Sequence, residues 1–252
     1  GASDTVALSQ FANKHNLKLY FDSAHAFGCM VGDTKISNFG DIEVFSFHAT
    51  KVLNATEGGC LCTNDDALAS RLRNIRSSYG AGKAVPVVKT SNGRMSEAQA
   101  AVALMSLEDF PKNQQNNKTL FEAYSKRLKR IPGIKLVRPA GVTVSNYQYI
   151  VCQIDEDNFG LSRDSLVSVL KAENVIARRY FYPGTHRSIE YRNTLSESSD
   201  YLSVTNHLCS SCMQLPVGAL VDNDDVETIC DIIERSSFNS NILKQHFSGC
   251  ER

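Results

Sequence analysis

The chain has 252 residues, of which 42% are hydrophobic, and its 27 basic residues balance its 27 acidic ones. That composition allows a sizeable core, and the charge balance argues against a dedicated binder of nucleic acid or membrane surfaces. No apolar stretch reaches the ~18 residues of a membrane span, and the eight cysteines follow no disulfide spacing, so we expect reduced thiols in a cytoplasmic protein.

The first 110 residues alternate between helical and extended patterns. Apolar residues recur at helical spacing over 5–15, and apolar runs typical of strands follow at 17–21, 41–48 and 58–63. A helix is predicted at 65–78 with Asn64 as its N-cap, and a loop with three glycines follows over 80–93. The Ser96-x-x-Gln99 capping pattern opens a helix to about residue 109. Pro111 predicts a break before a second helix that ends near residue 130.

Beyond residue 132, short strands alternate with helices, which indicates a small α/β domain. Strands are predicted at 147–154, 175–182 and 213–215, and helices at 163–173, near 199–210 and at 222–234. The tail over 236–252 has little periodicity, so we expect it to fray or to dock as a short helix. The predicted organisation is one domain over 1–110, a second over 111–235 and this tail.

The number of strands in the first part is low for a parallel α/β sheet. Residues 1–95 predict three strands, whereas such sheets usually have about five or more, covered on both faces. We therefore expect the other strands to come from another chain, or from an N-terminal segment that this sequence lacks.

A carboxylate and an amine follow the ends of two predicted strands. Asp22 ends the apolar run 17–21, and Lys51 lies in a polar turn after the run 41–48, with Gly58-Gly59 behind it. A pyridoxal phosphate enzyme needs a lysine that holds the aldehyde as an imine, an acid beside the pyridine nitrogen, and hydroxyls near the phosphate. Lys51, Asp22 and Ser46 supply one of each.

Three motifs in order resemble the DegT/DnrJ/StrS family of sugar aminotransferases: FDSAHAFG, FSFHATKVLNATEGGCL and NGRMSEAQAA. The resemblance covers residues 5–234 and implies pyridoxal 5'-phosphate as cofactor. It implies the C-terminal part of a fold-type I large domain over 1–110, followed by a smaller α/β domain. The implied activity is amination of a keto group on a nucleotide-linked sugar, with an amino acid, expected to be glutamate, as donor.

The resemblance also gives residues their roles. It implies that Lys51 forms the imine and shuttles the proton, and that Asp22 pairs with the pyridinium nitrogen. His25 resembles the residue against the cofactor ring or its phenolic oxygen, and Ser46 the serine that contacts the phosphate. His48 lies two residues after Ser46, so if the strand continues it faces the same side, near the phosphate or the substrate. A solvated lysine, a turn aspartate, a core histidine and an ordinary strand serine are the alternatives.

Two further segments carry residues assigned by resemblance. Asn92 and Arg94 resemble an Asn-x-Arg that reaches the phosphate site of a neighbouring subunit, which implies a homodimer with shared active sites. An ordinary Asn-Gly turn is the alternative. In the segment 178–186, Arg179, Tyr182 and His186 are expected to approach the sugar nucleotide. The alternative there is an edge strand followed by a proline turn.

A cluster of metal-ligand types lies outside these motifs. His207-x-Cys209-x-x-Cys212 contains a Cys-x-x-Cys pair, but a structural zinc needs four ligands and no second pair lies at a fitting spacing. We therefore expect no metal here, and small thiols packed in a helix instead.

The resemblance leaves alternative functions open. Family members carry a segment before the Asp motif that cups the cofactor phosphate, and Asp22 comes too early for it. The chain could therefore be an inactive fragment that acts only as a dimerising or binding module. A dehydratase of the same family is a third possibility, but those enzymes replace the lysine, and Lys51 is retained.

Overall fold

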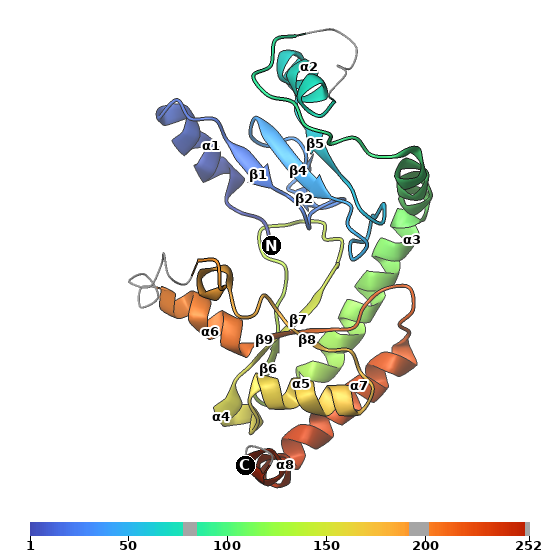
Figure 1. Ribbon diagram of the computed structural model, residues 1–252. Helices are drawn as coiled ribbons and strands as arrows, with labels where there is room; N and C mark the ends of the chain where they lie inside the picture. Colours follow the sequence, from blue (N-terminus) through green and yellow to red (C-terminus); the bar gives the residue numbers. More distant parts are fainter. Residues whose placement is uncertain (78–84, 192–201, 250–252) are drawn as a thin grey trace. The chain divides into compact units, whose positions relative to one another are not determined.

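The computed structural model describes residues 1–77, 85–191 and 202–249, which Figure 1 shows as a ribbon. The chain divides into two compact units. Unit 1 comprises Gly1–Gln115 and Arg138–Gln148, and unit 2 comprises Asn116–Val137 and Tyr149–Arg252. Parts of the predicted loop 80–93, of the predicted helix 199–210 and of the tail lie outside the described residues.

Unit 1 contains a three-stranded sheet of order β1-β4-β5, formed by β1 (Tyr20–Asp22), β4 (Ile42–Ser46) and β5 (Gly59–Cys62). β1 runs parallel to β4, whereas β5 pairs with β4 in the antiparallel sense. These are the three predicted strands of the first part, each shorter than its apolar run. A small hairpin of β2 (Met30–Val31) and β3 (Thr34–Lys35) was not predicted.

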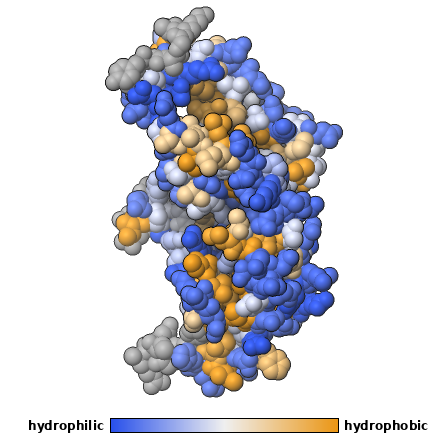
Figure 2. Space-filling view, turned by 90° about the vertical axis from the view of Figure 1, so that its right-hand side faces the viewer, coloured by the Kyte–Doolittle hydropathy of each residue, from blue (hydrophilic) through white to orange (hydrophobic). Residues whose placement is uncertain are grey.

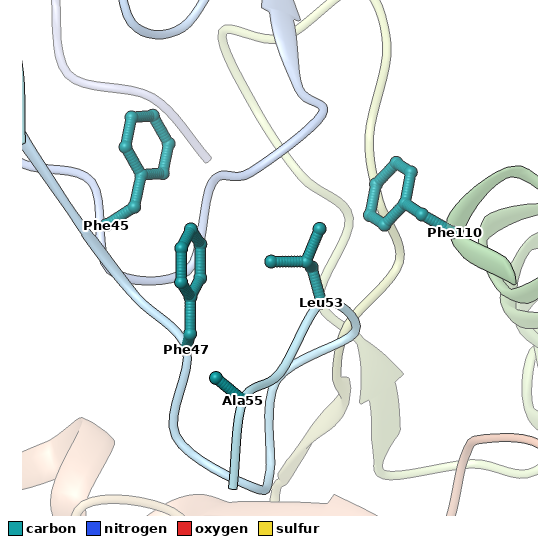
Figure 3. Packing of buried hydrophobic residues seen from close by; sticks show 5 residues of the cluster. All are labelled: Phe45, Phe47, Leu53, Ala55 and Phe110. Carbon is teal, nitrogen blue, oxygen red and sulfur yellow. The ribbon is translucent and has the colours of Figure 1, made fainter. Parts of the chain in front are cut away.

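The two faces of this sheet have different surroundings because side chains alternate along a strand. Figure 3 shows one face, where Phe45 and Phe47 join Leu53, Ala55 and Phe110 in a buried cluster. Each buried phenylalanine contributes about 1.5–3 kcal/mol through removal from water. On the other face Tyr20, Val44 and Leu61 are exposed to 60%, 40% and 50%. One face is therefore the core of unit 1, and the other is open.

Two helices of unit 1 begin at aspartate caps. In α1 (Thr5–Lys14) the Asp4 carboxylate accepts from the amide of Ala7 at 2.9 Å. In α2 (Asp66–Ile75) the Asp65 carboxylate accepts from the amides of Ala67 at 2.8 Å and Leu68 at 3.0 Å. The predicted cap at Asn64 is therefore wrong by one residue, because Asp65 is the side chain that reaches the orphan amides of the first turn.

The predicted helix break at Pro111 is wrong. A single helix, α3 (Glu97–Leu128), runs through Pro111, although the proline supplies no amide to its own turn. Phe110 is buried in the core of unit 1, and Leu120, Tyr124 and Leu128 are buried in unit 2. Packing on both sides of the proline therefore offsets the lost hydrogen bond.

The predicted capping box at the start of α3 is present. The Gln99 amide donates to the Ser96 hydroxyl at 3.2 Å, and the Gln99 side chain accepts from the Ser96 amide at 2.9 Å.

Unit 2 contains a four-stranded antiparallel sheet of order β6-β7-β9-β8. Its strands are β6 (Ile134–Leu136), β7 (Ile150–Ile154), β8 (Arg178–Arg179) and β9 (Cys212–Leu215). Its helices after α3 are α4 (Glu156–Phe159), α5 (Arg163–Ala172), α6 (Ser203–Ser211), α7 (Asn223–Phe238) and α8 (Ser240–Gly249), with a 3₁₀ turn at Thr185–Arg187. β6 was not predicted, and the predicted strand 175–182 is reduced to two residues. The tail is helical through the end of α8.

The segment Arg138–Gln148 belongs to unit 1, although the predicted second domain over 111–235 includes it. Its backbone pairs with β2: the Thr143 amide donates to the Met30 carbonyl at 2.8 Å, and the Met30 amide donates to the Val144 carbonyl at 3.0 Å. These bonds link residues more than a hundred positions apart, which local sequence patterns do not reveal.

Several large hydrophobic side chains of unit 1 remain exposed. On α3, Leu104 is 63% exposed, Met105 66% and Leu107 47%. Figure 2 shows that hydrophobic residues reach the surface among hydrophilic ones on the side it views. Among the described helices, none is long and apolar enough to cross a membrane.

Candidate active site

The parallel pair of strands places two predicted site residues at one edge of the sheet. Asp22 is the last residue of β1 and lies opposite Val44 of β4, while Ser46 ends β4 two positions further on. Residues two apart in a strand share a face, so Asp22 and Ser46 both lie on the open face of the sheet. Parallel strands end at the same edge, which brings the carboxylate and the hydroxyl to one side of unit 1.

The turn after β1 is fixed by several hydrogen bonds. The Ser23 amide donates to the Val44 carbonyl at 2.9 Å, and the Ala24 amide donates to the Asp22 carboxylate at 3.1 Å. The Asn146 side-chain amide donates to the carbonyls of His25 at 2.9 Å and Phe27 at 3.0 Å. The path of the chain from Asp22 to Phe27 is therefore defined by bonds to β4 and to the segment 138–148.

The turn is also anchored in the core. The ring of Phe27 packs edge-on against three other phenylalanines, with centroid distances of 5.9 Å to Phe45, 5.9 Å to Phe47 and 5.1 Å to Phe110. Aromatic pairs in this geometry add stability beyond their buried area. Because Phe27 follows His25 by two residues, this packing restrains the position of the histidine.

His25 is half-buried and interacts electrostatically with two other site residues. Burial lowers the pKa of His25 below its ordinary value of 6.5, and the positive charge of Lys51 lowers it further. The carboxylate of Asp22 acts in the opposite direction on the same pKa, and the N-terminal amino group adds a smaller lowering. The structure thus brings His25 within electrostatic reach of Lys51 and Asp22.

The loop that carries Lys51 is short and well anchored. The Lys51 amide donates to the His48 carbonyl at 2.9 Å, and the Ala55 amide donates to the Phe47 carbonyl at 2.8 Å. Leu53 and Ala55 are buried in the same cluster as Phe47 (Figure 3). The loop therefore leaves the end of β4, turns at Lys51 and returns to the core within a few residues, which leaves the Lys51 side chain half-buried.

His48 is engaged with its own loop. Its Nδ1 accepts from the Thr50 amide at 3.2 Å and lies 2.9 Å from the Thr50 hydroxyl oxygen. This acceptance places the ring proton on Nε2, which faces a carboxylate oxygen of Glu57 at 3.6 Å. The His48 amide donates to the Ser46 hydroxyl oxygen at 3.3 Å. His48 thus orders the turn between Ser46 and Lys51.

Asn92 and Arg94 lie on an exposed loop after α2. The Gly93 amide between them donates to the Arg76 carbonyl at 2.9 Å, which ties the loop to the end of that helix. Met95, the next residue, packs against the cluster of Phe45 and its neighbours. The loop therefore reaches the core of unit 1 at Met95, while the two predicted phosphate ligands are exposed at its surface.

The three predicted substrate residues lie in unit 2, and two of them stack. The guanidinium carbon of Arg179 lies 4.2 Å from the centroid of the Tyr182 ring, which is a cation–π contact. His186 pairs through Nε2 with the Asn206 side-chain oxygen at 2.8 Å. Arg179 and Tyr182 are exposed, so both can meet a ligand.

Three polar residues that support these sites were not predicted from the sequence: Glu43, Asn146 and Arg163. Glu43 is 1% exposed on β4, Asn146 is 4% exposed, and Arg163 is 2% exposed with its guanidinium carbon 5.4 Å from the Tyr182 ring. The position of Glu43, a charged residue inside the apolar run 41–48, could have indicated a buried polar contact. Asn146 lies in a turn-like segment and Arg163 at the start of a helix, and neither position indicates such a contact.

The cluster around His207 has ordinary partners. The Gln153 side-chain nitrogen lies 2.9 Å from His207 Nε2, and the Cys209 thiol donates to the Phe181 carbonyl at 3.7 Å. Across the described ranges, no group of three or more His, Cys, Asp or Glu side chains could hold a metal ion. The seven described cysteines are free thiols.

The side chains at the ends of β1 and β4 fit pyridoxal 5'-phosphate. They comprise an exposed carboxylate (Asp22), a hydroxyl (Ser46), an amine (Lys51) and an aromatic ring (His25) within one part of unit 1. The carboxylate can pair with the pyridinium nitrogen, and the hydroxyl can donate to the phosphate. The amine can form an imine with the aldehyde, and the aromatic ring can stack on the flat ring of the cofactor. The donor set therefore matches each part of the cofactor.

The sequence matches known proteins over most of its length. A model of the DegT/DnrJ/EryC1/StrS aminotransferase family matches residues 1–234. The chain is 35% identical over 230 residues to dTDP-4-amino-4,6-dideoxy-D-glucose transaminase of Shigella dysenteriae, and 28% identical over 229 residues to the protein of that name from Escherichia coli. These matches cover 91% and 90% of this chain, but 62% and 61% of the two relatives.

Solved structures agree with this result. DesI, crystallised in the presence of its TDP-sugar product, has a TM-score of 0.88 and 35% identity, and the match covers 98% of this chain and 62% of that one. The Helicobacter pylori aminotransferase PseC has a TM-score of 0.84 at 22% identity, over 95% of this chain and 64% of that one, and shows the fold alone. The chain thus spans about three fifths of the length of these proteins.

Proposed function

The chain belongs to the DegT/DnrJ/EryC1/StrS aminotransferase family, and from this membership we propose that it acts as a pyridoxal 5'-phosphate-dependent aminotransferase on a keto nucleotide-sugar. The observation that carries the proposal is the group of Asp22, His25, Ser46 and Lys51 at the ends of two parallel strands. Its residue types match those that the cofactor needs, and it lies inside the matched region.

The bound cofactor would supply the electron sink that makes the α-hydrogen of an amino acid removable as a proton. Lys51 would hold the aldehyde and then, once displaced, move the proton as an amine. The carboxylate of Asp22 would keep a proton on the ring nitrogen, and the hydroxyl of Ser46 would donate to the phosphate. The ring of His25 would lie against the flat cofactor. Its half-buried position is restrained through Phe27 and Asn146.

The proposed substrates follow from the relatives. The curated relatives act on a dTDP-linked dideoxy sugar by name, and DesI was crystallised with a TDP-sugar product. We propose a keto nucleotide-sugar as amino acceptor and glutamate as donor. In unit 2, the exposed Arg179–Tyr182 stack offers a cation for a diphosphate and an aromatic face for a sugar or base, with His186 nearby in sequence.

We also propose a cytoplasmic homodimer with shared active sites. Asn92 and Arg94 are exposed beside the core of unit 1, where a second subunit could receive them. The exposed hydrophobic residues Leu104, Met105 and Leu107 of α3 are typical of a surface that another chain covers.

Cofactor uptake tests the assignment of Lys51. Wild type should develop the visible absorbance band of lysine-bound cofactor, and Lys51→Ala should not. Lys35→Ala, which removes an exposed lysine of β3 in the same unit, is the control and should keep the band. Equal spectra in wild type and Lys51→Ala would overturn the assignment. A stable dimer in which even wild type takes up no cofactor would instead favour a dimerising or binding module.

A further inference from the structure

Glu43 is a buried acid whose two oxygens are both engaged. It lies on β4 on the core face of the sheet and is 1% exposed. One oxygen accepts from the amides of Ser37 at 2.9 Å and Phe39 at 2.7 Å. The other accepts from the hydroxyl of Ser23 at 2.7 Å. Burying a carboxyl group is costly unless donors of this kind surround it, so the contacts account for an acid in this place.

The contact with Ser23 connects Glu43 to the candidate active site. Ser23 directly follows Asp22 and precedes His25 by two residues. It is held at three atoms: its amide donates to the Val44 carbonyl at 2.9 Å, its hydroxyl donates to Glu43, and its carbonyl accepts from the Ala26 amide at 2.9 Å. The turn that carries Asp22 and His25 is therefore held in place at Ser23, which is hydrogen-bonded to Glu43.

The other two contacts of Glu43 serve a separate purpose. Ser37 has a φ of 136°, a conformation that a residue with a side chain rarely adopts, and its amide is held by Glu43. The amides of Ser37 and Phe39 thus fix the loop before β4, whereas Ser23 fixes the turn after β1. A variant of Ser23 can release the turn without releasing that loop.

We propose that Glu43 is a positioning residue, which through the Ser23 hydroxyl holds the turn of Asp22 and His25 in the orientation that the cofactor site requires. The inference rests on the proposed function for the roles of Asp22 and His25. Glu43 itself lies on the core face of the sheet, and its direct contact with the turn of Asp22 and His25 is the hydrogen bond from Ser23. A buried acid tied to one side of the site in this way restrains both residues at once.

Two variants and one control separate this role from general stabilisation. Ser23→Ala removes the link to the turn alone, and Glu43→Leu removes both carboxylate oxygens while keeping a side chain of similar size; Glu43→Gln is unsuitable, because its amide could donate to the Ser23 hydroxyl oxygen and keep the link. Thr63→Val is the control, because the Thr63 hydroxyl makes a comparable bond of 2.7 Å to the Asp41 carbonyl at the opposite end of β4. Ser23→Ala and Thr63→Val each lose one hydroxyl hydrogen bond next to the same sheet.

The first readout is the pKa of His25, measured by NMR on the protein without cofactor and assigned with His25→Gln. The charged groups that act on this ring are Lys51, Asp22 and the N-terminal amino group, and its burial is the largest effect. Release of the turn exposes the ring, so the pKa of His25 should rise toward 6.5 in Ser23→Ala and Glu43→Leu and stay unchanged in Thr63→Val. The second readout is hydrogen exchange of the Ala26 amide, which should become at least about tenfold faster in the first two variants.

An unchanged His25 pKa and an unchanged Ala26 exchange rate in Ser23→Ala would overturn the inference, even if Glu43→Leu fails to fold. The same shifts in Thr63→Val would overturn it too, because they would show a general loosening of the sheet. Since neither readout uses the cofactor, the result is independent of the absorbance test of Lys51. A failure of the proposed function and a failure of this inference are therefore distinguishable.

Discussion

The side-chain amide of Asn146 donates to the carbonyl oxygen of His25 at 2.9 Å across 121 positions of sequence. The same amide donates to the Phe27 carbonyl at 3.0 Å, and the Asn146 side-chain oxygen accepts from the Gln148 amide at 3.1 Å. A segment 121 positions further along the chain thus completes the turn that follows β1. The position of His25 depends on a contact between distant parts of the chain.

Replacement of Asn146 should destabilise unit 1 and loosen this turn. Asn146→Ala leaves the carbonyls of His25 and Phe27 without the bonds that Asn146 supplies, in a place where the side chain is only 4% exposed. An unsatisfied buried polar group costs about 1–3 kcal/mol, and we expect a loss in that range by urea unfolding. Faster hydrogen exchange of the Ala26 amide should accompany it.

The matched control is Asn38→Ala, because Asn38 is exposed and its amide donates to the Lys35 carbonyl at 3.2 Å within a local turn. It should change the unfolding free energy by less than about 0.5 kcal/mol. Equal effects of the two alanine variants would contradict a special role for Asn146.

The lowered pKa of His25 predicts a pH dependence of stability. In the fold this pKa lies below 6.5, so the unfolded chain binds the proton first as the pH falls. The contribution of neutral His25 to stability is therefore present above about pH 6.5 and is lost as the pH falls from there toward the folded-state pKa. Urea unfolding at about pH 7.5 and about pH 5.5 should show the fall.

Substitutions assign this pH dependence to its causes. His25→Gln should flatten the slope, whereas His15→Gln, which changes an exposed histidine of the same unit, should keep it. Lys51→Met should reduce the slope without abolishing it, because burial is a larger cause of the shift than the charge of Lys51. A slope that survives in His25→Gln would refute the assignment.

Much of unit 1 was predictable because its signals are local. Apolar runs marked β1, β4 and β5, and polar residues at their ends marked Asp22 and Lys51. That Asp22 and Ser46 lie on the same face and at the same edge of the sheet depends on the parallel register of β1 and β4, which the sequence does not reveal. Fold class and family were accessible from the motifs, and the family match confirmed them.

Prediction from local sequence patterns is wrong where contacts between distant residues override local preference. Pro111 predicts a break, but Phe110 on one side and Tyr124 on the other are buried in the two units, and this packing keeps α3 continuous. The segment 138–148 carries no strong pattern and is placed by its pairing with β2. Glu43 lies in an apolar run, and its partners Ser23, Ser37 and Phe39 become visible only in the fold.

Gly133 is a position where unit 2 should tolerate no side chain. Its φ is +73°, and a Cβ there would lie 2.1 Å from the Phe159 amide nitrogen. Gly133→Ala should therefore cost about 3 kcal/mol or more, from the backbone conformation and the clash with main-chain atoms together. Gly32→Ala is the control, because Gly32 has a φ of +57° with nothing within 4 Å, so only the conformational cost of about 1 kcal/mol should appear. Thermal unfolding of both variants gives the comparison, and equal costs would refute the clash.

Mixed dimers provide the sharpest test of a shared active site. If Arg94 serves the site of the neighbouring subunit, a dimer of Lys51→Ala with Arg94→Ala contains one site with both residues intact. Random pairing makes half of the dimers mixed, so about a quarter of the wild-type sites should be restored on co-expression, although each variant alone is inactive. If Arg94 serves its own subunit, every site in the mixed dimer lacks one residue and no activity returns. The control pairs Lys51→Ala with Asp22→Ala, two residues of the same sheet edge, and should restore nothing. Transamination of a keto nucleotide-sugar by glutamate is the measurement, and recovery in the first pair but not in the control would establish that Arg94 acts across the dimer.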